Sequence, residues 1–227
     1  MNRKNVVETK CYSPSSVVAF EKNFQKIEIP KASFLKRPFD FMLSLMGLII
    51  STPLWILIPA SIWLESRRPI FYYQSRVGKR GKVFRVRKFR SMIKDAEKHS
   101  GAVWAEENDS RVTRVGRILR ATAMDELPQL LSILKGDMSF VGPRPERPEL
   151  VTQFSEEIPN YDLRHLVKPG LTGMAQIFGQ YDTPPKHKLK YDLLYVKKHN
   201  IWLDLKLILL SFWITFKGKW ESREKKI

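Results

Sequence analysis

Two adjacent carboxylates, Asp125 and Glu126, are the residues of this sequence whose types and spacing best suit chemistry on a phosphate group. A carboxylate can attack a phosphorus atom and form a covalent intermediate, while its neighbour moves a proton or helps to hold a divalent cation. The pair opens a predicted helix that ends at Gly136. A structural interpretation is also available, because Asp125 is a good N-cap and Glu126 complements a helix dipole.

Arginines lie on both sides of this dyad. Arg144 stands between two prolines, and a Pro-Arg-Pro turn fixes one guanidinium, the group suited to two-point contact with a phosphate. Among the arginines of residues 109–120, which spiral round a predicted helix beginning at Asp109 or Ser110, Arg120 lies nearest the dyad. The pattern favours a site that neutralises a transferring phosphoryl group, although a surface turn would explain Arg144 equally well.

The bulk composition also points to anionic partners. Lys and Arg number 40 against 23 Asp and Glu, which gives a net charge of +17, and the hydrophobic fraction of 43% excludes a disordered polycation. The partner classes are therefore nucleic acid, an anionic membrane surface or phosphorylated substrates. The single Cys11 fits a reducing environment, and no signal peptide is recognised.

Residues 66–93 carry ten cations and no acid. Two β-like runs, Ile70–Gln74 and Val83–Phe89, flank a glycine-bounded turn and predict a hairpin. A basic rim against anionic lipid headgroups, worth about 1 kcal/mol per cation, accounts well for Arg67, Arg68, Lys79 and Arg80. Lys88 and Arg90 are the exceptions, because they lie where a strand gives way to a turn and can point into a site.

The most apolar segment, Phe39–Leu64, is long enough to cross a bilayer, but Ser51-Thr52-Pro53 interrupts it. Cations flank both of its ends, so the positive-inside rule gives no preferred direction. A helix pair that enters and leaves on one face and a single-pass helix are both consistent with these features. A second apolar run, Trp202–Phe216, suits either a helix lying in the interface or a buried core helix.

The rest of the C-terminal half is predicted from the same kinds of pattern. Residues 146–168 are expected to be helical and amphipathic, and Val167–Gly173 is expected to be a loop. Lys188–Lys198 is predicted to form a helix that carries Asp192.

Seven short motifs occur in one order along the chain: Lys36-Arg37-Pro38-Phe39-Asp40, Gln74-Ser75-Arg76-Val77-Gly78, Lys88-Phe89-Arg90-Ser91-Met92, Asp125-Glu126-Leu127-Pro128-Gln129, Lys135-Gly136-Asp137-Met138-Ser139, Val141-Gly142-Pro143-Arg144-Pro145 and Pro169-Gly170-Leu171-Thr172-Gly173. Together they resemble the bacterial sugar transferases, the monotopic phosphoglycosyl transferases, from about residue 34 onwards. The resemblance implies an α+β, mostly helical protein with a small β-hairpin and a re-entrant, proline-broken helix hairpin. It divides the chain into a flexible tail (1–32), a membrane helix (33–68) and a cytoplasmic catalytic domain with an interfacial C-terminal helix (69–227).

The resemblance also implies roles for individual residues. Asp125 would be the nucleophile of a Mg²⁺-dependent ping-pong reaction and a ligand of the metal, with Glu126 as its partner. Thr52-Pro53 matches the break in the family's re-entrant helix, which favours the hairpin. The residues expected to bind substrate or phosphate are Lys88, Arg90, Arg120, Arg144 and Asp192. Many members carry a hydroxyl residue shortly before the dyad, where this chain has Ala123-Met124.

The implied reaction moves a sugar 1-phosphate from a UDP-sugar to a polyprenyl (undecaprenyl) phosphate, releases UMP and initiates a bacterial glycan. The expected partners are the UDP-sugar, polyprenyl phosphate and membrane lipids, without nucleic acid; a homodimer is left open. The expected location is the cytoplasmic face of the bacterial inner membrane. Residues 181–196 resemble the galactose or glucose branch more than the N-acetylated one. The alternative function is a membrane-anchored polyanion-binding or scaffold protein without catalysis.

Overall fold

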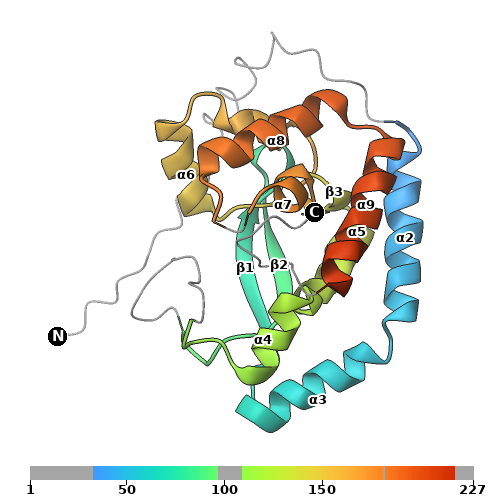
Figure 1. Cartoon of the computed structure of the whole chain (residues 1–227), viewed down its shortest axis with the longest axis vertical. Helices are drawn as coiled ribbons and strands as arrows, with labels where there is room; N and C mark the ends of the chain where they lie inside the picture. Colours follow the sequence, from blue (N-terminus) through green and yellow to red (C-terminus); the bar gives the residue numbers. More distant parts are fainter. Residues whose placement is uncertain (1–32, 97–108, 181, 218–227) are drawn as a thin grey trace, which may run out of the picture.

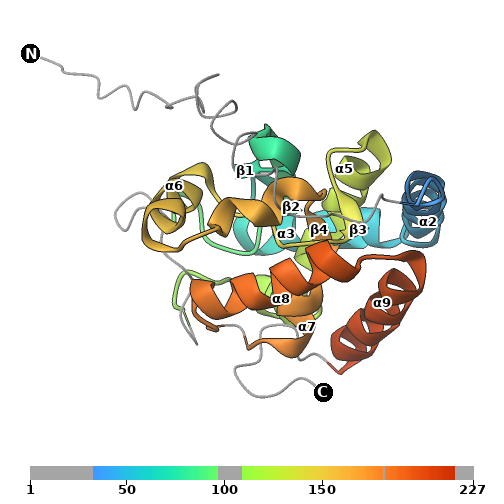
Figure 2. The same cartoon turned by 90° about the horizontal axis from the view of Figure 1, so that it is seen from above.

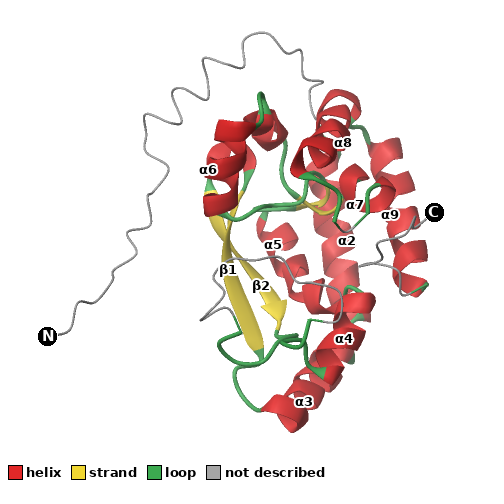
Figure 3. Cartoon of the chain, turned by 60° about the vertical axis from the view of Figure 1, so that its left-hand side comes forward, coloured by secondary structure: helices red, strands yellow, loops and turns green. Residues whose placement is uncertain are grey.

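The computed structural model describes residues 33–96, 109–180 and 182–217. The predicted tail, residues 1–32, lies outside this range. A long β-hairpin runs through the middle of the molecule, with a bent helix pair along one side and a group of shorter helices at one end (Figure 1). Helices dominate and strands are few, which confirms the α+β, mostly helical class (Figure 3).

The bent pair consists of α2 (Lys36–Ile50) and α3 (Leu54–Ser66), which meet at an angle of 60°. The Thr52 hydroxyl donates to the carbonyls of Ile49 (2.8 Å) and Leu48 (3.2 Å) at the break, where the Thr52 amide also bonds Ile49 (3.2 Å) and the Ser51 hydroxyl also bonds Leu48 (3.3 Å). No single helix within the described ranges has the length and apolarity to cross a membrane, whereas α2 and α3 together do. The predicted break at Thr52-Pro53 is therefore where the helix bends.

The hairpin pairs β1 (Phe71–Val77) with β2 (Val83–Phe89) in antiparallel register, with Tyr73 opposite Arg87 and Tyr72 opposite Lys88. The connecting 3₁₀ turn, η1 (Lys79–Gly81), places Arg80 at φ 56°. Because side chains alternate along a strand, Arg85 and Arg87 lie on one face, where they stack on Tyr73 at 4.6 and 5.2 Å. Lys88 lies on the other face.

The middle of the chain forms α4 (Arg114–Ala121), the 3₁₀ helix η2 (Met124–Gln129), α5 (Leu130–Lys135) and β3 (Ser139–Val141). The expected start of α4 at Asp109 or Ser110 is wrong. Thr113 caps it instead, through a hydrogen bond from the Gly116 amide to its hydroxyl (2.9 Å), because the preceding residues turn back to bond Ser91 and Ile93 in the loop after β2.

The C-terminal part contains α6 (Pro148–Glu157), η3 (Tyr161–Leu166), β4 (Gly170–Thr172), α7 (Met174–Phe178), α8 (Pro185–Lys198) and α9 (Ile201–Phe216). The single helix expected over 146–168 is thus two elements separated by a turn at Asn160, whose φ is 63°. β4 pairs in parallel with β3, although Val167–Gly173, which contains β4, was expected to be a loop. Seen from above, α8 crosses in front of the strands, and α9 lies beside α2 (Figure 2).

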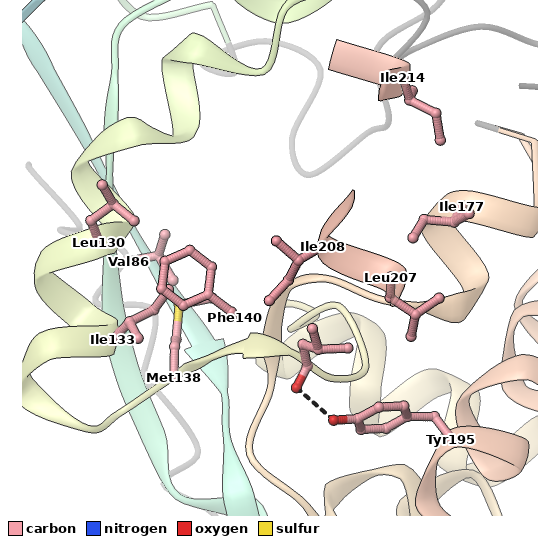
Figure 4. Close-up of a cluster of buried hydrophobic side chains, with 11 residues drawn as sticks. Val86, Leu130, Ile133, Met138, Phe140, Ile177, Tyr195, Leu207, Ile208 and Ile214 are labelled. Atoms are coloured by element: carbon pink, nitrogen blue, oxygen red, sulfur yellow. Dashed lines mark hydrogen bonds between the residues drawn. The ribbon is translucent and has the colours of Figure 1, made fainter. Parts of the chain in front are cut away.

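The main core lies between the hairpin, α5 and α9 (Figure 4). It gathers Val86 of β2, Ile133 of α5 and Leu207 of α9, and Phe39 of α2 packs against it. Tyr195 of α8 belongs to the same core, and its hydroxyl donates to the carbonyl of Val141 at 3.0 Å. The membrane-helix candidate α2 is therefore packed against the rest of the fold.

A large apolar surface remains exposed on α2, α3 and α9. Its most exposed members are Met42, Ile49, Ile50, Ile56, Leu57, Leu64, Trp202, Leu209, Phe212 and Phe216, each at least 60% exposed. An apolar patch of this extent is unusual for a free surface and marks a membrane or protein contact. Helix α9 buries one face in the core, as a core helix does, and exposes the other; its position in the membrane interface stays a prediction.

Candidate active site

The dyad lies in η2, between α4 and α5, and both of its residues are buried. The expectation that Asp125 caps an α-helix is wrong. Ala123 is the first flanking residue, with φ 55°, and α5 begins only at Leu130. With Ala123 in the cap position, Pro128 provides a physical reason for the 3₁₀ form, because it lacks the amide that an α-helix would bond to the Met124 carbonyl. The carboxylates are therefore directed to side chains of other elements.

Glu126 is held by two cations from distant parts of the chain. Its Oε1 accepts a hydrogen bond from Lys88 Nζ at 2.5 Å, and its Oε2 accepts one from Arg144 Nη1 at 3.1 Å. Arg144 Nη2 also donates to Oε1, so the arginine contact is two-pronged. Burial opposes ionisation of Glu126, but Arg144 and Lys88 outweigh it and hold the pKa of this carboxyl below its ordinary value.

Asp125 lies beside this cluster. Lys88 Nζ is 3.7 Å from its Oδ2, so one ammonium group contacts both carboxylates of the dyad. The Asp125 side chain is 10% exposed, whereas 35% of the Arg144 side chain is accessible. The guanidinium therefore reaches from buried Glu126 towards the surface, where an anionic group can approach it.

Three elements bring the cluster together. Strand β2 presents Lys88 on the face that packs on η2, and the loop after β3 presents Arg144. This loop lies close to β4, since a Cβ at Gly142 would stand 2.3 Å from the Lys168 carbonyl oxygen. Only glycine permits so close an approach of two backbones. The parallel β3–β4 pair thus places the Pro-Arg-Pro turn next to the dyad.

Two other predicted site residues are positioned differently. Arg120 is in the last turn of α4, where its carbonyl accepts from the Ala123 amide at 3.2 Å, immediately before the dyad. Arg90 is buried and directed to the end of α3, where its Nη2 donates to the carbonyls of Ser66 (2.8 Å) and Arg67 (2.9 Å). The structure therefore joins Arg90 to the bent helix pair.

Asp192 of α8 is linked to Arg144 through one intervening residue, Arg164. Its Oδ2 accepts from Arg164 Nε at 3.0 Å and lies 2.8 Å from Arg164 Nη2, which also donates to the Arg144 carbonyl at 2.8 Å. Burial raises the pKa of Asp192 to about 6, against the lowering effect of Arg164. Arg164 was not singled out in the sequence, where nothing distinguishes it from a surface arginine; its burial between η3 and α8 is a tertiary property.

The predicted Mg²⁺ would take its protein ligands from the carboxylates of this site. Within residues 33–96, 109–180 and 182–217, no group of three or more His, Cys, Asp or Glu is arranged to hold a metal. Both oxygens of Glu126 accept hydrogen bonds from cations. Mg²⁺ commonly binds one or two carboxylates together with water and substrate phosphates. The donor set therefore fits an ion shared by Asp125 and a substrate diphosphate, and this cofactor stays a prediction.

The site combines a buried carboxylate pair with a lysine and a partly accessible arginine. Such a combination suits a protein that transfers phosphoryl groups. Comparison with known proteins gives this class its family. Residues 31–218 match the family model described as bacterial sugar transferase. The chain belongs to the bacterial sugar transferase family, which confirms the resemblance seen in its motifs.

Curated relatives agree with this assignment. The chain is 42% identical over 184 residues to a UDP-N-acetylgalactosamine-undecaprenyl-phosphate N-acetylgalactosaminephosphotransferase of Aeromonas hydrophila, covering 79% of this chain and 43% of the relative. It is 44% identical to a UDP-glucose:undecaprenyl-phosphate glucose-1-phosphate transferase of Klebsiella pneumoniae, covering 81% and 40%. It is 41% identical to the exopolysaccharide production protein PSS of Rhizobium leguminosarum bv. phaseoli, covering 77% and 91%. The chain thus spans about two-fifths of the length of the first two relatives.

Proposed function

We propose that this protein transfers a sugar 1-phosphate from a UDP-sugar to undecaprenyl phosphate and so initiates the assembly of a bacterial glycan. The observation that carries the proposal is the dyad cluster, in which Lys88 and Arg144 hold Glu126 beside Asp125. The family match and the relatives' names supply the substrate classes.

The proposed chemistry has two displacements at one phosphorus atom. A carboxylate oxygen of Asp125 attacks the phosphorus that carries the sugar, the bond to the bridging oxygen breaks, and UMP leaves. A phosphate oxygen of undecaprenyl phosphate then attacks the same phosphorus, which yields the lipid diphosphosugar and restores the Asp125 carboxylate. Splitting the reaction in this way fits ping-pong kinetics.

The other residues of the cluster stabilise charge. Lys88 and Arg144 neutralise the oxygens of the transferring group and of the departing UMP. Glu126 fixes both cations in place, since each donates to it. Mg²⁺, held by Asp125 and the diphosphate, would supply further neutralisation of phosphate charge when bound.

We propose further that the protein sits on the cytoplasmic face of the inner membrane. The exposed apolar surface of α2, α3 and α9 supports this location. Cations stack on tryptophans at the C-terminal ends of α3 and α9, Arg67 over Trp63 at 4.6 Å and Lys217 over Trp213 at 4.5 Å, as suits a headgroup boundary. Residues 33–68 would then form a re-entrant membrane segment and 69–227 the catalytic domain.

The activity is tested by UMP release from a panel of UDP-sugars with undecaprenyl phosphate in detergent or nanodiscs. We expect turnover of at least one UDP-sugar and its loss in Asp125→Asn. Asp95→Asn is the matched control, because Asp95 is exposed and its φ of 59° suits asparagine. Without acceptor, the wild-type protein, but not Asp125→Asn, should gain the mass of the phosphate of the sugar that is turned over on the peptide containing residue 125. Normal transfer by Asp125→Asn would refute the nucleophile assignment.

Topology is tested by thiol labelling in a Cys11→Ser background. Ser33→Cys, before α2, and Ser75→Cys, on β1, both introduce exposed thiols. Labelling of both by an impermeant reagent only in inverted vesicles would support a hairpin that returns to its starting face. Labelling of the two positions from opposite sides would instead indicate a single-pass helix.

A further inference from the structure

The loop that carries Arg144 is fixed by hydrogen bonds to four consecutive backbone carbonyls. Each donor comes from a different place: the Gly170 amide bonds Pro143 (3.0 Å), Arg164 Nη2 bonds Arg144 (2.8 Å), Arg76 Nη1 bonds Pro145 (2.9 Å) and the Val77 amide bonds Glu146 (2.9 Å). Two prolines in the loop also fix φ at their positions. The backbone beneath the Arg144 side chain is therefore held along its whole length.

The donor that bonds the carbonyl of Arg144 itself belongs to a buried ion pair. Arg164 is 4% exposed and Asp192 is 2% exposed. Arg164 donates through Nε to Asp192 Oδ2 at 3.0 Å and through Nη1 to the Tyr161 hydroxyl at 2.7 Å. These contacts fix the plane of the guanidinium and leave Nη2 directed at the Arg144 carbonyl.

Neither member of the pair has a hydrogen bond or ion pair to the dyad among the interactions found in the described part of the chain. Their link to Glu126 passes through Arg144, whose backbone Arg164 holds and whose guanidinium bonds Glu126. A small shift of the loop would therefore alter a two-pronged contact whose geometry is directional.

We propose that Arg164 and Asp192 are positioning residues of the transferase reaction, which set the place of the Arg144 guanidinium through the backbone of its loop. The inference rests on the proposed function for its kinetic consequence, but its structural basis is the chain of contacts from Asp192 through Arg164 to Arg144. In this proposal Asp192 orients Arg164 and does not itself contact the phosphate.

Breaking the pair at one partner would leave a buried charge uncompensated and impair folding whatever its role. The test therefore uses the double variant Arg164→Met/Asp192→Leu, which removes both charges and keeps apolar volume, a replacement that proteins often tolerate. Arg164→Lys is the second variant, because lysine keeps the charge without the guanidinium plane. Thermal unfolding of both variants is measured first.

The decisive measurement is a double-mutant cycle with Arg144→Ala, read as kcat for UMP release. Misplacement of a catalytic group by about 1 Å costs roughly 100-fold in rate, so we expect a loss of that order in the wild-type background. With Arg144 already replaced, the same double variant should cost less than about threefold, because the group being positioned is gone. Equal losses in both backgrounds would overturn the proposal and leave the pair a purely structural role.

A second readout does not depend on the reaction. The amides of Gly170 and Val77 bond the loop carbonyls, so their hydrogen exchange reports on the loop directly. We expect hydrogen exchange at both amides to accelerate in Arg164→Lys. Exchange at the Gly116 amide of α4, which bonds the hydroxyl of the capping residue Thr113, should stay unchanged. Unchanged exchange at Gly170 and Val77 would overturn the inference. A wild-type protein that releases no UMP from any UDP-sugar would refute the proposed function and leave this exchange test decisive.

Discussion

Glu126 and Arg144, 18 residues apart in the chain, form a two-pronged ion pair in which both terminal nitrogens of the arginine donate to the carboxylate. Lys88 completes the contact from β2 at 2.5 Å. Because both oxygens of Glu126 accept hydrogen bonds from cations, we propose that Glu126 holds these cations in place and that the neighbouring Asp125 attacks phosphorus.

The first prediction concerns Arg144. Arg144→Ala should lower kcat for UMP release by roughly 100-fold, the usual effect of removing one preorganised donor to developing charge. Arg144→Lys should recover only part of this loss, because an ammonium group cannot make the two-pronged contact. Arg117→Ala on the exposed side of α4 is the control and should leave the rate unchanged. Full activity of Arg144→Ala would show that the guanidinium does not act on the reacting phosphate.

The second prediction concerns pH. Burial raises the pKa of Asp192 to about 6, above that of a carboxyl in the unfolded chain, while Arg164 and Lys188 favour its ionised form and Glu146 opposes it. As pH falls, the folded protein therefore protonates Asp192 before the unfolded chain does. Protonation between about pH 4 and pH 6 does not destabilise the fold, and the contribution of this proton to folding stability is lost as pH rises through 6. Protonation does weaken the hold on Arg164, so activity should fall as pH drops below about 6.

The acid limb of the pH–rate profile is measured as the burst of UMP release without acceptor, because omitting the acceptor avoids titration of the lipid phosphate. Thermal unfolding at each pH shows whether the protein stays folded. The double variant Arg164→Met/Asp192→Leu, which removes both buried charges, should have a lower rate and should lack the part of the acid limb that depends on Asp192. An identical acid limb in the wild type and this double variant would assign the titration to another group.

The sequence allowed the dyad, Lys88 and Arg144 to be predicted together, because the residue types state their chemistry and two prolines mark one arginine as fixed. The hairpin strands and the bend at Thr52-Pro53 were predicted for similar local reasons: alternation, glycines and a missing amide. Such features depend on near neighbours in the chain.

The residues that were missed depend on distant ones. Each strand of the β3–β4 pair has three residues, too few for a periodic pattern, and their pairing joins residues 139–141 to 170–172. In the sequence, Arg164 looks like any other polar residue of a helix. Only in the folded structure is it buried, in contact with Asp192 of α8. The 3₁₀ form of the dyad segment was mistaken for a capped α-helix, because a carboxylate suits the start of either, whereas the structure places Ala123 in the cap position with Pro128 inside the segment.

The third prediction concerns the close packing of β3 against β4. Gly142→Ala would place a methyl group 2.3 Å from the Lys168 carbonyl oxygen, so the strands must separate. We expect a destabilisation of about 1–3 kcal/mol and a reduced kcat, since the Arg144 loop begins at this residue. The control is Gly47→Ala in α2, where the nearest atom is a Leu130 methyl at 3.2 Å, part of a flexible side chain. Denaturant unfolding compares the two, and equal stability would contradict the packing argument.

The fourth prediction concerns the exposed face of α9. Leu209 and Phe212 are 62% and 63% exposed, and we expect this face to lie in the membrane interface. Burying a leucine or phenylalanine side chain is worth about 1.5–3 kcal/mol, so Leu209→Ser/Phe212→Ser should weaken partition into anionic vesicles by at least roughly 100-fold. Ile93→Ser is the control, because Ile93 is 51% exposed and lies in the loop after β2. Vesicle co-sedimentation measures the partition, and equal binding by both variants would show that α9 does not contact lipid.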